Sequence, residues 1–158
     1  MVAYTENGVI DAVGFGRLVA GITLQVRNLP EQRWALVCQD TLWFAAGFLA
    51  LTQASKTIIL PQTNQPSSVQ TARATAILTD QPMRFSSFVT LDPAQAADAD
   101  GLGSMDLDPQ LNIELYTSGS TGQPKRVDKY LGQLHAEVTE LENMWGGMLG
   151  DAVVVATV

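Results

Sequence analysis

The chain has 158 residues, of which 46% are hydrophobic, and its 9 basic and 16 acidic residues give a formal net charge of −7. This length is typical of one domain with a sizeable core. The acidic balance argues against nucleic-acid binding, which requires a basic face, and against binding to anionic membranes. The longest apolar run, residues 42–51, is too short to span a bilayer.

The cysteine content and the N-terminus bear on the cellular compartment. Cys38 is the only cysteine, which excludes an intrachain disulfide framework and favours a reducing compartment. Residues 1–11 contain neither the basic nor the apolar segment of a secretory signal peptide. We therefore expect a cytoplasmic protein.

The first clear element is a helix over residues 13–28. Apolar side chains recur at helical spacing from Phe15 to Ile22, with polar residues between them. Asn28 and Pro30 are predicted to end this helix.

A strand, a helix and a second strand follow. Residues 33–38 form a nearly continuous apolar run, as expected for a strand that is buried on both faces. Asp40 is a good N-cap for a helix over residues 41–54, which is apolar nearly all round and should be well buried. Residues 56–60 form another β-rich run before Pro61. This order predicts a βαβ unit with parallel strands.

The alternation of helices and strands continues. Ser67 is predicted to cap a short helix that ends near Ala72 or Arg73, and residues 74–78 and 85–91 are predicted strands. The sequence therefore predicts an α/β class in which helices pack on a mainly parallel sheet.

Residues 92–109 are acidic and contain no lysine or arginine. The sequence Asp98-Ala99-Asp100-Gly101 suggests a calcium loop, but the EF-hand spacing fails because the glycine comes too early and no glutamate follows at the twelfth position. A solvated acidic loop is the better interpretation.

The stretch that follows has the composition of a phosphate-binding loop. Residues 111–116 alternate apolar and polar, which predicts a half-buried strand, and residues 126–130 are a candidate second strand. Between them, Gly119 and Gly122 can adopt positive φ, so the backbone N–H groups can converge on an anion. Lys125 adds a point charge suited to phosphate. Four hydroxyl side chains complete the stretch: Thr117, Ser118, Ser120 and Thr121. The spacing is not that of a Walker A loop.

This stretch resembles the signature loop of the adenylate-forming (AMP-binding) enzymes, which include acyl-CoA and aryl-CoA synthetases, peptide-synthetase adenylation domains and luciferases. Their pattern, apolar/Tyr-Thr-Ser-Gly-Ser/Thr-Thr-Gly-x-Pro-Lys, is met at every position from Tyr116 to Lys125. The order of elements over residues 13–61 also resembles the N-terminal part of the family. The chain departs from the family at Arg126, where relatives commonly have a glycine, and lacks the Thr-His pair that commonly opens the next helix.

The last predicted elements are a helix over residues 131–145 and a buried strand over residues 152–158. Apolar residues in the helix form one stripe from Leu131 to Trp145, which we expect to pack on the sheet, and Gly146 and Gly147 are expected to end the helix. His135, the only histidine, is expected to be a surface residue. The three tryptophans are expected to be core residues: Trp34, Trp43 and Trp145.

The resemblance implies an ATP-dependent carboxylate ligase. Such an enzyme forms an acyl- or aryl-adenylate and passes the acyl group to the thiol of coenzyme A or of an acyl carrier protein. ATP phosphates would be bound by residues of the loop, with Thr121 as a possible ligand of Mg²⁺. By the family pattern these residues are Thr117, Ser118, Gly119, Ser120, Thr121, Gly122 and Lys125.

The resemblance covers residues 1–158 as the N-terminal segment of the AMP-binding domain. The family's adenine-binding motif, its ribose-binding aspartate and its C-terminal domain with the catalytic lysine are not found in this sequence. We therefore expect an N-terminal fragment of the ligase that is inactive on its own. Two alternatives are a non-catalytic module that binds phosphate or nucleotide, and an α/β scaffold that pairs with another chain.

Overall fold

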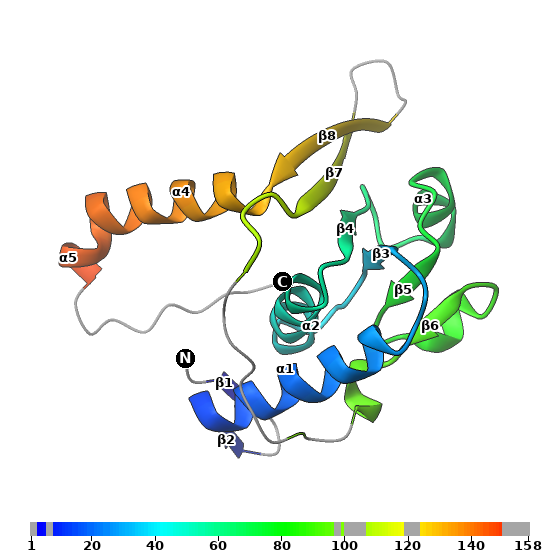
Figure 1. Ribbon diagram of the computed structural model, residues 1–158, viewed down its shortest axis with the longest axis horizontal. Coiled ribbons are helices and arrows are strands. Elements are labelled where there is room, and N and C mark those ends of the chain that lie inside the picture. Colours follow the sequence, from blue (N-terminus) through cyan, green and yellow to red (C-terminus); the bar gives the residue numbers. More distant parts are fainter. Residues whose placement is uncertain (1–2, 6–7, 97–98, 100–106, 119–123, 150–158) are drawn as a thin grey trace.

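The computed structural model describes residues 3–5, 8–96, 99, 107–118 and 124–149. They form a six-stranded sheet in the order β6-β5-β3-β4-β7-β8 and a separate two-stranded ribbon, β1-β2 (Figure 1). All neighbours in the large sheet are parallel except β7 and β8. The predicted α/β class with a mainly parallel sheet is confirmed.

The bounds of the elements are as follows. The strands are β1 (Ala3–Thr5), β2 (Gly8–Ile10), β3 (Arg33–Leu36), β4 (Thr57–Leu60), β5 (Ala76–Leu78), β6 (Val89–Leu91), β7 (Asn112–Ser118) and β8 (Pro124–Tyr130). The helices are α1 (Ala12–Arg27), α2 (Thr41–Gln53), α3 (Pro66–Thr71), α4 (Leu131–Leu141) and α5 (Gly147–Leu149). Two 3₁₀ turns and one π-helical segment complete the set: η1 (Pro82–Phe85), η2 (Pro93–Gln95) and η3 (Glu142–Gly146).

The predicted βαβ unit is present as β3-α2-β4. The two strands pair in parallel, with Trp34 opposite Ile58. Asp40 caps α2 as predicted, because its Oδ1 accepts hydrogen bonds from the backbone N–H of Leu42 at 2.7 Å and of Trp43 at 3.4 Å. These bonds satisfy N–H groups that have no partner within the helix.

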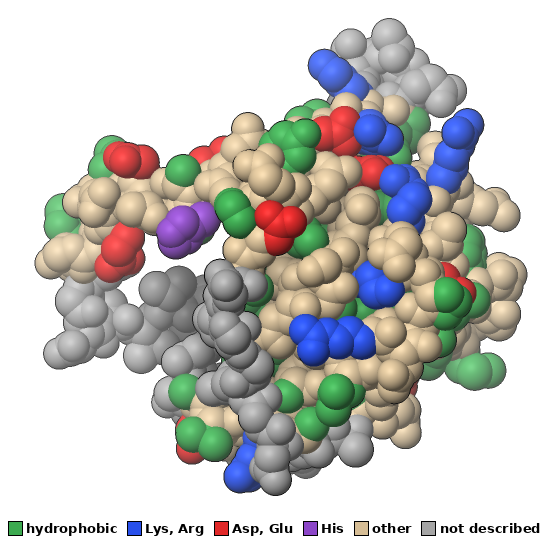
Figure 2. All heavy atoms as spheres, viewed as in Figure 1, with side chains coloured by type: hydrophobic (Ala, Val, Ile, Leu, Met, Phe, Trp, Pro, Cys, Tyr) green, Lys and Arg blue, Asp and Glu red, His purple; other side chains and the backbone are tan. Residues whose placement is uncertain are grey.

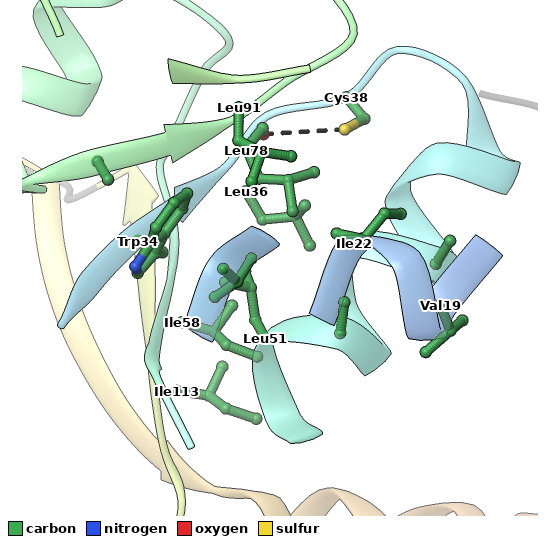
Figure 3. Packing of buried hydrophobic residues seen from close by; sticks show 14 of the residues in the cluster. Val19, Ile22, Trp34, Leu36, Cys38, Leu51, Ile58, Leu78, Leu91 and Ile113 are labelled. Atoms are coloured by element: carbon green, nitrogen blue, oxygen red, sulfur yellow. Dashed lines mark hydrogen bonds between the residues drawn. The ribbon is translucent and has the colours of Figure 1, made fainter. Parts of the chain in front are cut away.

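Each face of the sheet is covered differently. Helices α1 and α2 cover the first face, and Figure 3 shows Ile22 and Leu51 among the sheet residues Leu36 and Ile58. The second face has a smaller cluster, in which Val69 of α3 packs with residues of β3 and β5. Burying a leucine or isoleucine contributes about 1.5–3 kcal/mol, so the first face supplies most of the core stability.

Two predictions in the middle of the chain are wrong in detail. Helix α3 begins at Pro66 after Gln65, so Ser67 lies inside the first turn and is not the cap. Proline suits this position because its missing N–H would have no helical partner there. The predicted strand over residues 85–91 begins only at Val89, because Phe85 belongs to η1 and is buried in the smaller cluster.

The expected packing of the 131–145 helix on the sheet is also wrong. Leu131 and Leu134 pack against the core, but Val138 is 62% exposed and Leu141 and Trp145 are each 47% exposed. The helix starts from β8 at the sheet edge and points away from the sheet (Figure 1). Trp145 is therefore not a core residue.

The glycines after Trp145 do not end the helical segment either. The chain continues through the π-helical segment η3 and on to Leu149 in α5, and Gly147 keeps right-handed helical dihedrals. The predicted strand over residues 152–158 and half of the predicted acidic loop over residues 92–109 lie outside the described residues. No helix in the described ranges is long and apolar enough to cross a membrane.

Candidate phosphate-binding hairpin

The stretch with the phosphate-loop sequence sits on an antiparallel hairpin. Strand β7 runs parallel to β4 and pairs with it from Ile58↔Ile113 to Leu60↔Leu115. On its other side β7 pairs with the edge strand β8 through Ser118↔Pro124. The last residues of β7 therefore extend beyond β4, past the carboxyl edge of the parallel strands (Figure 1). This edge is the usual ligand-binding edge of an open α/β sheet.

The hairpin brings three of the seven predicted phosphate-binding residues together. Thr117 and Lys125 are direct cross-strand partners, and Ser118 is the last residue of β7. The Thr117 hydroxyl donates a long hydrogen bond of 3.5 Å to the backbone carbonyl of Lys125. The other four predicted residues lie outside the described residues: Gly119, Ser120, Thr121 and Gly122. The phosphate-binding role of all seven stays a prediction.

Lys125 differs from the other two cations of β8. Arg126 pairs with Glu114 and Asp128, and Lys129 pairs with Glu137. Lys125 is exposed, and its ammonium has no ion-pair partner among the residues that the structure places. Its positive charge is therefore available to an anion at the end of the hairpin.

A buried carboxylate lies at the base of this hairpin. Glu114 of β7 is 1% exposed, and Arg33 of β3 binds it through its two terminal guanidinium nitrogens, with Nη2 at 2.9 Å from Oε2. Nη1 of Arg126 lies 3.7 Å from the same Oε2. The hydroxyl of Tyr116 donates to it at 3.4 Å. We call Arg33, Glu114, Tyr116 and Arg126 the Glu114 cluster.

Neighbouring carboxylates raise the pKa of both arginines in this cluster. The hydrogen bond with Glu114 raises the pKa of the Arg33 guanidinium above its ordinary value, against the opposing effect of burial. The hydrogen bond with Asp128, and then the charge of Glu114, raise the pKa of Arg126. Arg33 also donates to the backbone carbonyls of Ala72 at 3.1 Å and Arg73 at 3.3 Å, which ties β3 to the end of α3.

The sequence did not reveal the Glu114 cluster. Glu114 occupies a polar position of an alternating strand, which indicates a solvent-facing side chain. It is buried because β3 and β8 each place an arginine beside it, and these partners lie 81 and 12 positions away in the chain. One signal was available in the sequence, a lone carboxylate in a strand predicted to be half buried. Its partners could not be predicted, because they depend on which strands lie beside β7 in the sheet.

Two other reactive side chains do not form sites. Cys38 is 7% exposed, its thiol donates to the carbonyl of Leu78 (dashed line in Figure 3), and burial raises its pKa to about 12. A thiol with this pKa is almost fully protonated at neutral pH and is a poor nucleophile. His135 is exposed on α4, as predicted. The described residues contain no group of three or more His, Cys, Asp or Glu side chains that could hold a metal ion.

An apolar groove runs between α2 and α4. It has a volume of about 680 Å³ and is bordered by the first turns of α4 on one side and by α2 on the other. The residues that line it are Phe48, Leu49, Leu107, Pro109, Leu131, Gly132, Leu134, His135 and Val138. The groove lies on the α1–α2 side of the sheet, away from the Glu114 cluster.

Solved structures share this fold. The o-succinylbenzoate CoA synthetase (MenE) of Bacillus subtilis, in complex with its acyl-adenylate intermediate, aligns with a TM-score of 0.67 at 16% identity, over 92% of this chain and 34% of that chain. The N-terminal subdomain of Klebsiella oxytoca NpsA gives 0.55 at 18% identity, over 75% and 34%. The amide bond synthetase McbA of Marinactinospora thermotolerans gives 0.54 at 17% identity, over 89% and 34%.

These three proteins are members of the AMP-binding family. The chain therefore has the fold of the N-terminal part of an adenylate-forming enzyme. It spans about a third of the length of the solved structures that it matches. The sequence matches no protein-family model and no curated protein.

Proposed function

We propose that this chain is the N-terminal, ATP-phosphate-binding part of an AMP-forming carboxylate ligase. The observation that carries the proposal is the β7–β8 hairpin, which presents Thr117, Ser118 and Lys125 at the carboxyl edge of the sheet and encloses the signature sequence. The shared fold and the acyl-adenylate bound in one of its relatives support the same conclusion.

The reaction has two steps. A carboxylate oxygen of the acid attacks the α-phosphorus of ATP and forms a new P–O bond. The bond from the α-phosphorus to the bridging oxygen breaks, and pyrophosphate leaves with the bonding electrons. In the second step a thiolate attacks the acyl carbon, and AMP leaves as the thioester forms.

The hairpin would act on the first step. Negative charge accumulates on the departing pyrophosphate, and preorganised donors aimed at that charge lower the barrier. Lys125 supplies a full positive charge, and Thr117 supplies a hydroxyl donor beside it. The hydroxyl of Ser118 is proposed to add a further donor. The loop residues 119–122 are proposed to add backbone N–H groups.

ATP and Mg²⁺ are the proposed cofactors. The described part of the chain offers no carboxylate cluster for a metal, but Mg²⁺ in nucleotide sites is held largely by phosphate oxygens and water with one or two protein ligands. The donor set of the loop fits that requirement, with Thr121 as the proposed protein ligand. The partners would be a carboxylic acid and either coenzyme A or an acyl carrier protein; the 158-residue chain alone is proposed to be inactive.

The test is ATP–pyrophosphate exchange on the full-length gene product. Replacing Lys125 with alanine should lower exchange about 100-fold, because one transition-state donor is worth about 3 kcal/mol. Lys129→Ala is the matched control: it removes a lysine from the same strand, but one that is paired with Glu137. Exchange should stay near the unmodified level in this control.

The same assay separates the alternatives. A non-catalytic module would bind ATP without any exchange, and Lys125→Ala would then weaken binding only. A scaffold that pairs with another chain would show neither binding nor exchange, and changes in the hairpin would have no effect on either. Equal exchange in Lys125→Ala and the unmodified protein would refute the proposed role of the lysine.

A further inference from the structure

We infer that the Glu114 cluster is a positioning device that fixes β8 against β7 and so sets the place of Lys125 relative to the phosphates of ATP. This inference rests on the proposed function of the hairpin. It assigns a role to Glu114, Arg33 and Arg126, which lie outside the signature sequence.

Strand β8 lies at the edge of the sheet. Among the described residues its only strand neighbour is β7, whereas β7 pairs with a strand on both sides. Side chains of β8 are mostly exposed, so apolar packing contributes little to holding this strand. Arg126 is the described residue that joins β8 by an ion pair to a buried group of the central sheet.

Side chains alternate between the two faces of the sheet along β8. Neighbouring residues on a strand point to opposite faces. The side chain of Arg126 lies on the same face of the sheet as Glu114 and Tyr116, and Tyr116 is its direct cross-strand partner. Lys125 and Thr117 face the other side. The attachment of Arg126 therefore holds the backbone at Lys125 while leaving the Lys125 side chain free.

Glu114 is itself held in place by Arg33. Glu114 lies three residues before Thr117, and Arg33 binds its carboxylate with two hydrogen bonds. Arg33 belongs to β3, which lies two strands away from β7 with β4 between them. Because Arg33 is also bonded to the carbonyls of Ala72 and Arg73, the carboxylate is fixed to the rigid interior of the fold. A bidentate guanidinium–carboxylate pair restricts orientation as well as distance.

The negative charge of Glu114 lies between two positively charged side chains. Figure 2 shows Lys and Arg side chains gathered near the outer end of the hairpin, with acidic side chains among them. Two guanidinium groups converge on Glu114. Without its carboxylate, Arg126 would stay paired only with Asp128 of its own strand, and no ion pair among the described residues would join β8 to β3 or β7. Strand β8 would then be held to β7 by backbone pairing alone, and we expect the position of Lys125 to become less restricted.

The experiment uses the full-length gene product and five variants: Glu114→Gln, Arg126→Ala, the double variant of these two, Arg126→Lys and Lys129→Gln. Lys129→Gln is the control, since it removes the Lys129–Glu137 ion pair of the same strand without touching the cluster. For each variant we measure the midpoint of thermal unfolding and the hydrogen-exchange rate of the backbone amides of residues 125–128. Pyrophosphate exchange gives kcat, the KM for ATP and the KM for the acid.

We expect Glu114→Gln and Arg126→Ala to raise the KM for ATP at least 10-fold and to speed amide exchange in β8, with the KM for the acid unchanged. Arg126→Lys should recover part of the lost ATP affinity, because the ammonium keeps a positive charge near Glu114 but cannot bind Asp128 through two nitrogens as the guanidinium does. Adding Arg126→Ala to Glu114→Gln should change little further, since both remove the same attachment. The control should behave like the unmodified protein.

A lower unfolding midpoint with unchanged ATP KM and unchanged β8 exchange in Arg126→Ala would overturn the inference and leave a purely structural role. Arg126 is 48% exposed, so this variant should fold even if Glu114→Gln does not. Failure of the proposed function can be distinguished from failure of this inference, because the unmodified protein would then show no pyrophosphate exchange. In that case the dissociation constant for ATP is measured in place of KM, and amide exchange in β8 is compared between the variants as before.

Discussion

Gly47 provides a sharp test of how closely α2 packs on the sheet. A Cβ atom at this position would lie 2.7 Å from Cδ2 of Leu78 and 3.0 Å from Cδ1 of Leu36, both well inside ordinary van der Waals contact. Leu78 is fully buried and Leu36 is 3% exposed, so neither can swing out into solvent. Replacing Gly47 with alanine should therefore force the helix away from β3 and β5 or distort two core leucines.

The magnitude follows from two opposing effects. Alanine in a helix interior is favoured over glycine by about 1 kcal/mol. Overpacking a dense core typically costs about 1–3 kcal/mol. The clash at Gly47 involves two buried side chains at once, so the second effect should prevail. We expect Gly47→Ala to lower the free energy of unfolding by about 1 kcal/mol.

The matched control is Gly14→Ala in α1, where a Cβ would meet its nearest atoms at 3.4 Å, which is ordinary contact. This variant should be neutral or more stable by up to about 1 kcal/mol. Urea unfolding followed by far-UV circular dichroism gives both values. If Gly47→Ala is as stable as Gly14→Ala, α2 does not approach the sheet as closely as described and the packing argument fails.

Three further predictions test other parts of the structure. Burial raises the pKa of the Cys38 thiol from 9.0 to about 12, so the contribution of the protonated thiol to stability is complete below pH 9 and is lost between pH 9 and 12. For the same reason, iodoacetamide at pH 8.5 should label Cys38 about 1,000-fold more slowly in the folded than in the unfolded chain, as measured by mass spectrometry. Replacing Asp40 with alanine removes the cap of α2 and should cost about 1 kcal/mol in urea unfolding, and no loss would contradict the cap. Val138→Ser should change the unfolding free energy of the 158-residue chain by less than about 0.5 kcal/mol, since Val138 is 62% exposed, whereas a loss of several kcal/mol would show that α4 packs on the sheet after all.

The sequence predicts the βαβ unit well because its signals are local. An apolar run, the capping residue Asp40 and a second apolar run identify β3, α2 and β4, and none of these signals depends on distant residues. The position of the hairpin was predictable for the same reason, since alternation over residues 111–116 marks β7 and glycines mark the turn.

The errors concern features that depend on distant neighbours. The stripe of α4 has the right spacing for packing, but whether a helix meets the sheet is decided by the direction in which β8 delivers it. Glu114 has the position of a solvent-facing residue, and it is buried only because Arg33 comes from another strand of the sheet. Periodicity identifies which side chains share a face but not what that face contacts.

The basic residues of β8 admit a simpler explanation than phosphate binding. Charged side chains on an edge strand prevent it from pairing with other molecules, and lysine is common for this purpose. That explanation accounts for Arg126 and Lys129 equally well, since both are on the exposed edge. Edge protection does not explain why Lys125 differs from Arg126 and Lys129. Arg126 and Lys129 are paired with carboxylates. Lys125 lies beside Thr117 at the outer end of the hairpin and has no such partner among the described residues. Protection of an edge needs charge anywhere along the strand, but binding of an anion needs an uncompensated charge at one place. The distribution of ion pairs along β8 thus favours an anion at the end of the hairpin over edge protection alone.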